Sequence, residues 1–346
     1  MANRRIDWYR TRLEPARLRE LTERRDSPGL AQCLSFVLIL MVLGSLCFWL
    51  WTLKLWILLV PACWLYSTFL FLASMAAGVH ELSHGTAFKS KWLNEAFYNL
   101  FCFLTWNNPV HFRASHAYHH QDTLHRGIDL EVSQIPVAEK LNARNLFLWF
   151  TFDAPWCWLL VRTAFRHAFA DDRADYFGWK PLFDRDDPRR KAMFRWARLM
   201  ILGHLILTAV FAFFQLWILI YLVSLGSFFA SWLGKFYGSL QHSGLSESVP
   251  DWRLSCHTVE FGPVNRFLYW NMNYHIEHHM YAAVPFHNLP KLHALVAPDY
   301  PLPQKGLVAG LRKLYEIRRA QMKDPSYAYV PPFPETATPP RFREGS

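Results

Sequence analysis

AQCLSFVLILMVLGSLCFWLW, residues 31–51, is an uncharged apolar run near the start of a chain of 346 residues. As an α-helix that rises about 1.5 Å per residue, this run is long enough to cross the hydrocarbon core of a bilayer. After Lys54, a second uncharged run continues over residues 55–79. The two runs predict a transmembrane hairpin, which returns the chain to the side of the membrane on which it started.

A second hairpin is predicted later in the chain. Residues 201–240 form another long apolar stretch, in which Lys235 is the only formal charge. Because this stretch is long enough for two helical spans, we assign spans to residues 198–215 and 217–240, with a turn near Gln215. Both hairpins then deliver the segment that follows them to the same side of the membrane.

The predicted fold is all-α: a polytopic membrane protein with two helical hairpins, four spans and a cytoplasmic helical cap. The apolar stretch 145–170 is interrupted by charges and by Pro155, so we expect it to lie at the membrane interface rather than to form a fifth span. Both termini are expected to be cytoplasmic, and the proline-rich tail to be disordered. The predicted regions are a basic arm (1–30), a single domain (31–323) with cap segments 80–197 and 241–323, and the tail (324–346).

The composition supports a membrane protein. Hydrophobic residues make up 52% and aromatic residues 17% of the chain, more than a soluble domain usually carries. A net charge of +10 is compatible with binding to nucleic acid, to anionic lipid or to an acidic protein. Because the chain also has predicted membrane spans, we attribute this charge to the membrane topology and to contact with lipid headgroups. The sequence contains no glycine-rich nucleotide-binding motif, and we expect no nucleic-acid partner. Its six cysteines form no C-x-x-C pair, so we expect reduced thiols.

Three clusters of histidines follow the apolar runs. They are His80-Glu-Leu-Ser-His84, His116-Ala-Tyr-His119-His120 and His275-Ile-Glu-His278-His279. Residues three and four apart share a helix face, so each cluster directs two or three imidazoles toward one point. Neutral imidazole binds iron, zinc, copper and nickel. With His242, which follows the last apolar run, the candidate ligands number nine, enough for two metal ions.

The other histidines are interpreted as structural. His204 lies alone within an apolar segment, and an isolated histidine of this kind is more often a hydrogen-bonded packing residue than a ligand. The same interpretation applies to His111, His125, His257 and His287.

Two other interpretations of the clusters stay open. His80-Glu81-Leu82-Ser83-His84 matches H-E-x-x-H, the pattern of zinc metalloproteases in which the glutamate is the general base. A membrane zinc protease, however, would leave the second and third clusters without a purpose. A metal transporter or sensor would hold its ligands near the middle of the membrane, whereas each cluster here lies at or beyond the end of an apolar run. We therefore favour an enzyme that holds two metal ions.

The clusters and their placement resemble the membrane fatty acid desaturase and hydroxylase superfamily over about residues 31–300. The three boxes of that family are H-x(3 or 4)-H, H-x(2 or 3)-H-H and H-or-Q-x(2)-H-H, and all three match this sequence. The resemblance implies a non-haem di-iron centre that uses dioxygen and two electrons to attack an unactivated C–H bond. The short first box is similar to those of acyl-lipid and sphingolipid desaturases, alkane hydroxylases and carotenoid ketolases.

The resemblance also implies roles for individual residues. Asp129, in Gly127-Ile-Asp129-Leu-Glu131 after the second box, is similar to an acidic residue of the family and would orient a ligand through its second ring nitrogen. No catalytic residue is predicted beyond the metal ligands. The implied iron ligands are His80, His84, His116, His119, His120, His242, His275, His278 and His279.

Function and partners are expected from the same resemblance. We favour desaturation of a lipid-linked fatty acyl chain over hydroxylation of a lipid, a hydrocarbon or a small polar metabolite. We expect no fused electron-carrier domain, so a separate carrier, a ferredoxin or a b-type cytochrome, and its reductase are implied. The arginine-rich segment 173–198 and the N-terminal arm are expected to attract anionic lipid headgroups and an acidic carrier.

Overall fold

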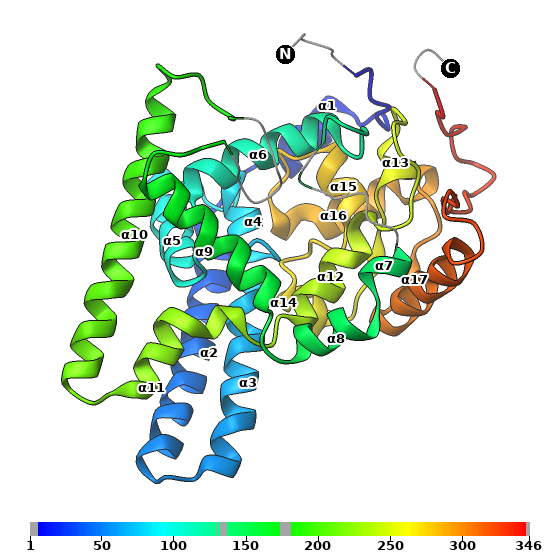
Figure 1. Ribbon diagram of the computed structural model, residues 1–346. Coiled ribbons are helices and arrows are strands. Elements are labelled where there is room, and N and C mark those ends of the chain that lie inside the picture. Colours follow the sequence, from blue (N-terminus) through cyan, green and yellow to red (C-terminus); the bar gives the residue numbers. More distant parts are fainter. Residues whose placement is uncertain (1–5, 130, 132–136, 174–180, 344–346) are drawn as a thin grey trace. The chain divides into compact units, whose positions relative to one another are not determined.

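The computed structural model describes residues 6–129, 131, 137–173 and 181–343 (Figure 1). The chain is mostly helical, in agreement with the predicted class. Its α-helices are α1 (Pro15–Leu21), α2 (Asp26–Thr52), α3 (Trp56–Leu72), α4 (Gly78–Ser83), α5 (Lys91–Leu104), α6 (Pro109–Asp122), α7 (Val137–Lys140), α8 (Ala143–Phe150), α9 (Ala154–Ala168), α10 (Pro188–Phe213), α11 (Trp217–Ile220), α12 (Trp232–His242), α13 (Trp252–Ser255), α14 (Pro263–Leu268), α15 (His275–Met280), α16 (Leu289–Val296) and α17 (Leu307–Gln321).

The other elements are short. A π-helix, η1 (Tyr221–Leu225), and a 3₁₀-helix, η2 (Gly226–Phe228), continue α11, and further 3₁₀ turns are η3 (Phe286–Asn288) and η4 (Ala297–Asp299). Two strands of two residues, β1 (Val259–Glu260) and β2 (Gln304–Lys305), pair in parallel. This small pair is a departure from the all-α prediction.

Contacts divide the chain into two compact units, each built from separate stretches of sequence. Helices α6 and α12 each continue from one unit into the other. The predicted arm, single domain and tail do not coincide with these units. We name them the histidine unit, which consists of Met1–Arg25, His116–Asn142 and Phe236–Ser346, and the hairpin unit, which consists of Asp26–Ser115 and Ala143–Lys235.

The hairpin unit contains both predicted turns. Helices α2 and α3 lie side by side (Figure 1), and the chain turns between them at Lys54, whose φ of 59° is a left-handed backbone conformation. The turn between α10 and α11 lies at Gln215, where φ is 58°. The predicted positions of both turns are confirmed.

Two segments are long and apolar enough to cross a membrane. They are Pro15–Thr52, which includes α2, and α10. Only 17% of the most apolar window of α10 is buried, so most of this window faces outward and is suited to lipid. Two shorter apolar helical segments, Trp56–Leu72 and Trp217–Phe228, each follow one of these helices. These segments indicate a membrane protein.

The predicted span 55–79 is longer than the helix that forms there. Helix α3 ends at Leu72, and a turn separates it from α4. The Ser74 hydroxyl donates to the Phe71 carbonyl oxygen at 2.5 Å, which helps to end the helix. Because residues 73–77 carry no charge and include no glycine or proline, the hydropathy of the sequence did not reveal this turn.

The predicted span 217–240 is not one helix. Helical structure from Trp217 ends at Phe228, and about 1.5 Å per residue makes this segment too short to cross the roughly 30 Å hydrocarbon core. The chain then bends at Ala230, where φ is 49°. The Ala230 N–H donates to the Thr151 carbonyl oxygen, and the Ser231 hydroxyl donates to Asp153 at 2.7 Å. The break therefore depends on the loop before α9, which lies far away in the sequence.

The predicted interfacial stretch 145–170 forms α8 and α9 with a break between them. Asp153 accepts the Trp156 N–H and thereby caps α9. With 15 residues, α9 is too short to cross a bilayer. Its inner face packs against α10, where Leu160, Ala164 and Met200 belong to one buried cluster.

The two ends of the chain are part of the histidine unit. In the described part of the arm, Tyr9 and Leu21 are buried in a core cluster that also contains Trp252. The tail has no helix or strand between residues 325 and 343, yet the Thr338 N–H donates to Asp299 and the Arg341 N–H donates to Asp251. The expectation of a disordered tail therefore does not hold for these residues. Residues 1–5 of the arm and 344–346 of the tail lie outside the described residues.

Arg253 holds these ends together from a fully buried position. Its guanidinium lies 2.7 Å from an Asp251 oxygen and 3.1 Å from Asp299, and it donates to the Thr338 carbonyl oxygen at 3.1 Å. The Tyr9 ring stacks on the same group, 3.8 Å from ring centre to Arg253 Cζ. Burial lowers the pKa of Arg253, but the two carboxylates raise it by more, so the group stays charged.

We predict that Arg253→Met destabilises the folded protein by about 3–5 kcal/mol, because it leaves Asp251 buried without its cation. Thermal unfolding of the full chain in detergent measures the effect. The control is Arg126→Met, which removes an ion pair to Glu247 whose arginine is 77% exposed, and should cost less than about 1 kcal/mol. Equal shifts for the two variants would contradict this account.

Candidate metal centre

Seven of the nine predicted ligands belong to the histidine unit. The end of α6 carries the second box, and the single short helix α15 carries the third box, so the spacing of three and four residues places each set on one helical face. His242 is the last residue of α12. The predicted ligands of this unit are His116, His119, His120, His242, His275, His278 and His279.

Three of these imidazoles, those of His242, His275 and His279, meet through the same ring nitrogen, and His119 lies near them. The Nε2 atoms of His275 and His242 are 2.9 Å apart, and those of His279 and His275 are 3.1 Å apart. His119, His242 and His279 each offer a ligand atom within 4.8 Å of the others, and all three side chains are buried.

The distances between nitrogens fit a shared metal ion. Two imidazoles bound to one ion at about 2.0–2.1 Å and at right angles have their nitrogens roughly 3 Å apart. The 2.9 and 3.1 Å distances agree with this value. A purely structural cluster would gain little from directing several Nε2 atoms at one point, because at least one nitrogen of each neutral ring is an acceptor.

The second nitrogen of each ring is held by a different partner. Nδ1 of His119 lies 2.8 Å from an Asp129 oxygen, and Nδ1 of His279 lies 3.0 Å from the Thr123 hydroxyl. Nδ1 of His242 donates to the Ser255 carbonyl oxygen at 2.9 Å. These contacts fix which nitrogen faces the cluster, as is usual around metal-binding histidines. Asp129 contacts one of these rings, and its predicted role of orienting a metal ligand stays a prediction.

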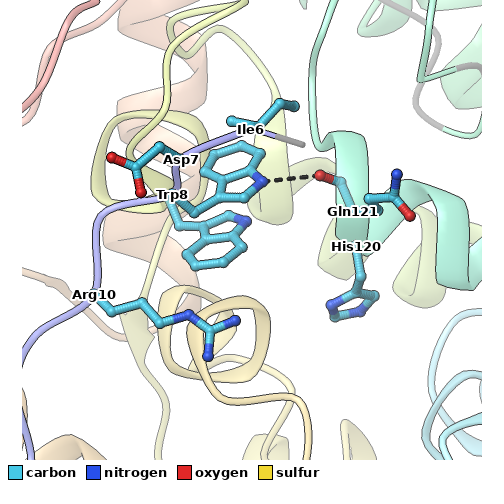
Figure 2. A pocket seen from close by; sticks show the side chains of 7 residues that line it. Ile6, Asp7, Trp8, Arg10, His120 and Gln121 are labelled. Atoms are coloured by element: carbon cyan, nitrogen blue, oxygen red, sulfur yellow. Dashed lines mark hydrogen bonds between the residues drawn. The ribbon is translucent and has the colours of Figure 1, made fainter. Parts of the chain in front are cut away.

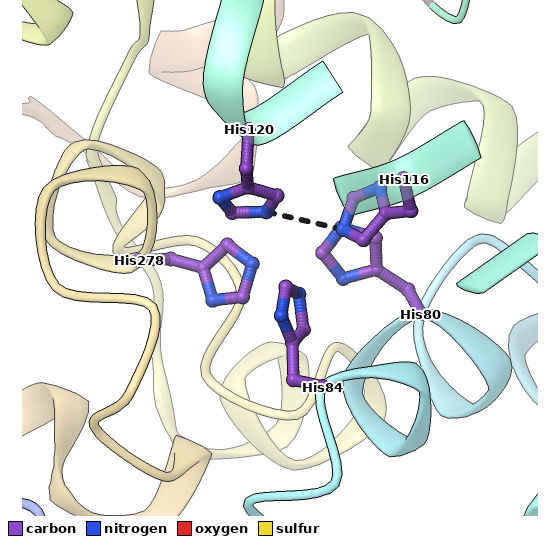
Figure 3. A group of neighbouring side chains, drawn as sticks. All are labelled: His80, His84, His116, His120 and His278. Carbon is purple, nitrogen blue, oxygen red and sulfur yellow. Dashed lines mark hydrogen bonds between the residues drawn. The ribbon is translucent and has the colours of Figure 1, made fainter. Parts of the chain in front are cut away.

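A second group lies in the same unit. His116, His120 and His278 offer ligand atoms within 4.8 Å of one another, and Figure 3 shows the hydrogen bond that joins the first two rings. The Nε2 atoms of His116 and His120 are 3.1 Å apart. Nδ1 of His116 lies 2.7 Å from Glu131, so this carboxylate contacts His116 in the same way that Asp129 contacts His119.

The first box belongs to the hairpin unit. His80 lies on α4, and His84 follows its last residue, with 5.5 Å between the two ring centres. Both rings are drawn in Figure 3. That they complete a metal site with the other boxes stays a prediction. Glu81 between them is 1% exposed and accepts from the Thr86 hydroxyl at 3.3 Å, a contact that fixes it within the hairpin unit.

In the group of His119, His242, His275 and His279, burial keeps three of the four imidazoles neutral. It lowers the pKa of His242 to about 3, and burial together with neighbouring histidines lowers the pKa of His275 and His279 well below the ordinary value. Burial also lowers the pKa of His119, but the Asp129 carboxylate raises it by more. Three of the four rings therefore need to lose no proton before they bind a metal at neutral pH.

The structure adds two residues, Glu277 and His293, that are not among the predicted site residues. Glu277 lies between two ligands in the third box, is fully buried and accepts from the Thr258 hydroxyl at 2.6 Å. Its other oxygen contacts Nδ1 of His293 on α16. The position of Glu277 within the box was a possible signal, but nothing in the sequence pointed to His293. His204 is structural, as predicted, because both its ring nitrogens are hydrogen-bonded and it stacks on Trp106.

A cavity of about 690 Å³ reaches the second box from the surface of the histidine unit (Figure 2). Trp8 and Trp252 form one wall as a parallel stack with ring centres 4.4 Å apart. The Trp8 indole N–H donates to the Gln121 carbonyl oxygen, and the Trp252 indole N–H approaches the Thr123 hydroxyl at 3.4 Å. The lining residues are Ile6, Asp7, Trp8, Arg10, His120, Gln121 and Trp252.

Together, the apolar helices and the converging imidazoles define a membrane metalloprotein with histidine ligands. Comparison with protein families matches residues 54–307 to the fatty acid desaturase family. Because this match covers well over half of the 346 residues, the chain belongs to the fatty acid desaturase family. No curated protein matches the chain in sequence. Membership of this family implies an oxidoreductase.

We predict that Asp129→Asn weakens metal binding about 10–100-fold, because His119 loses the carboxylate that orients it. Competition of the purified protein with a chelator measures the affinity for added iron(II). The matched control is Asp122→Asn on α6, whose carboxyl hydrogen-bonds to none of the predicted ligands among the described residues. Equal affinities of the Asp129 variant and the wild type would refute an orienting role.

Proposed function

We propose that this chain is a membrane enzyme that uses dioxygen and two bound irons to oxidise an unactivated C–H bond. Its substrate is a lipid-linked fatty acyl chain, and desaturation is the favoured outcome. Membership of the fatty acid desaturase family supports the reaction class. The observation that carries the proposal is the convergence of Nε2 atoms from His242, His275 and His279, with the opposite nitrogens of His242 and His279 held by other partners.

Two ions are proposed because the imidazoles form two groups. His119, His242 and His279 belong to one group, and His116, His120 and His278 to the other. In this proposal, His80 and His84 of the first box supply the remaining ligands, as the family's motif implies. Bound iron would activate dioxygen, and the reaction would consume two electrons. The protein's part is to present neutral imidazoles and to hold their orientation through Asp129, Glu131 and their neighbours.

The proposed topology places the boxes and both termini in the cytoplasm. Helices α2 and α10 cross the membrane in this proposal. Helix α3 returns the chain from α2, and the short Trp217–Phe228 segment returns it from α10 together with the bent residues that follow. Support comes from the basic start of α10, where five arginines and lysines precede its apolar part, as expected for a cytoplasmic end.

Hydroxylation is the second candidate outcome, because both reactions begin by removing a hydrogen from the same kind of C–H bond. The substrate would then be a lipid, a hydrocarbon or a small polar metabolite. The zinc protease is not favoured. A protease would need Glu81 to act on a water molecule at the metal, yet this side chain is buried and accepts from Thr86.

Electrons must be delivered from a separate carrier in this proposal, a ferredoxin or a b-type cytochrome with its reductase. The cavity lined by Trp8 and Trp252 offers a surface for that partner. The partly exposed Trp8 ring stacks on Trp252, and the Trp252 indole N–H approaches the Thr123 hydroxyl. The same hydroxyl contacts Nδ1 of His279, so a series of short contacts connects Trp8 to a proposed ligand. Arg10, which lines this cavity, and Arg12, two residues further along the chain, are both exposed, and their charges suit an acidic protein.

We predict that cells expressing the wild-type chain form lipids two hydrogens lighter than their precursors, and that the purified protein holds about two irons per chain. His279→Ala should abolish the product and lower the iron content, because it removes one converging nitrogen. Mass spectrometry of lipids and metal analysis of anaerobically purified protein measure both effects.

The control for this experiment is His287→Ala, which removes a histidine of the same unit outside the ligand set. It should keep both iron and product. A product one oxygen heavier would favour hydroxylation. Zinc in place of iron, or unchanged iron in His279→Ala, would overturn the di-iron proposal.

We predict that Arg10→Glu/Arg12→Glu lowers the rate with an acidic electron carrier roughly tenfold at low salt, and that the difference shrinks as ionic strength rises. Steady-state rates at several salt concentrations measure it, and a small chemical reductant should support wild-type rates in the variant. The control with the same charge change is Arg312→Glu/Arg319→Glu on α17, also exposed. A loss shared by both double variants would argue against docking beside Trp8.

A further inference from the structure

One face of α9 in the hairpin unit carries a stripe of aromatic and arginine side chains. Its members are three or four residues apart, so they lie on the same side of the helix and of the residue that follows it. The stripe consists of Trp158, Val161, Arg162, Phe165, Arg166 and Phe169.

The opposite face of α9 is buried within the hairpin unit. Leu160, Thr163, Ala164 and His167 are buried, and the helix packs along α10. The stripe therefore faces outward because the other face is occupied, and its exposure follows from the packing of the helix.

The composition of this outward stripe is unusual for a helix that faces water. Trp158 is 67% exposed and Phe169 is 81% exposed, and the polar residues between them are arginines only. Helices that lie in the membrane interface show this combination, since aromatic rings and arginine stems bury apolar surface while the guanidinium reaches the headgroups.

The stripe also lines a cavity of about 470 Å³. The Nε atom of Arg162 is buried and has no hydrogen-bond partner among the described residues. Arg166 lies 3.6 Å from Asp171, the one carboxylate of the lining, and Asp171 also accepts from Arg173 at 2.9 Å. The described lining thus carries two guanidinium groups, one helical turn apart, and one carboxylate, so two positive charges face one negative charge and the formal charge of the lining is +1.

We propose that this cavity binds the phosphate group of an anionic membrane phospholipid. Arg162 and Arg166 donate to the phosphate oxygens, and the rings of Trp158 and Phe165 cover the glycerol and the start of the acyl chains. Arginine forms strong, charge-assisted hydrogen bonds with phosphate, and a buried Nε donor without a partner is satisfied by such a ligand.

A lipid suits the site better than free phosphate. The walls of the cavity are mostly apolar side chains, which a small inorganic anion would leave uncovered. In addition, α9 packs on α10, a helix long and apolar enough to cross a membrane, whose Leu202 and Ile206 are exposed. The proposal concerns the hairpin unit alone and does not depend on the iron chemistry.

Native mass spectrometry of the delipidated full chain in detergent tests the proposal, with phosphatidylglycerol as the probe. We expect a retained phosphatidylglycerol, no retention of diacylglycerol with the same acyl chains, and no displacement by an equal concentration of inorganic phosphate. Arg162→Gln/Arg166→Gln should weaken phosphatidylglycerol binding about tenfold or more. Arg312→Gln/Arg319→Gln, which removes the same charge from α17, should bind as the wild type does.

Several results would overturn the proposal. They are wild-type binding by the Arg162 and Arg166 double variant, equal binding of diacylglycerol, and displacement by inorganic phosphate alone. If the double variant fails to elute as a single folded species, Arg166→Gln decides the question, because Arg166 is partly exposed and its replacement leaves the buried face of α9 intact. This single variant should weaken binding about threefold, and unchanged binding would count against the site.

Discussion

The central constraint on this protein is that an imidazole has two nitrogens and only one of them can face a metal. Where several neutral rings meet in a buried place, each ring needs a partner for the nitrogen that points away, or its orientation is lost. Asp129, Glu131, Ser255 and Thr123 provide those partners for four of the histidines. Their positions therefore limit how the surrounding backbone can run.

The rest of the histidine unit can be understood as support for these partners. Helix α15 carries three proposed ligands in six residues, and such a short helix holds its direction only through its neighbours. Glu277 ties it to Thr258 and His293, and the sulfur of Met280 accepts from the Tyr300 hydroxyl. The network around Arg253 then joins both chain ends to the same core. Precise placement of the ligands thus depends on residues from several distant stretches of sequence.

This dependence explains which features the sequence could predict. The histidine spacing is a local property of a helix, so the second and third boxes gather as expected. The turns at Lys54 and Gln215 are also local, since each lies between long apolar runs. In contrast, the contact of His293 with Glu277 and the burial of Tyr9 arise from tertiary packing, and a single sequence carries no periodic signal for such pairs.

Lys235 shows how a charge within an apolar run should be interpreted. If residues 217–240 formed one span, this ammonium group would lie within the membrane without a partner, at a cost of several kcal/mol. In the structure, the helix breaks before it, and Lys235 lies 3.6 Å from Asp153 and 4.2 Å from the centre of the Trp156 ring. Asp153 also accepts from Ser231 at the break itself, so the same carboxylate ends one apolar segment and satisfies the charge that follows. Because α12 begins again at Trp232, its direction does not have to continue that of α11. A lone lysine in an otherwise apolar stretch is therefore better interpreted as the mark of a break in the helix than as a tolerated exception within a span.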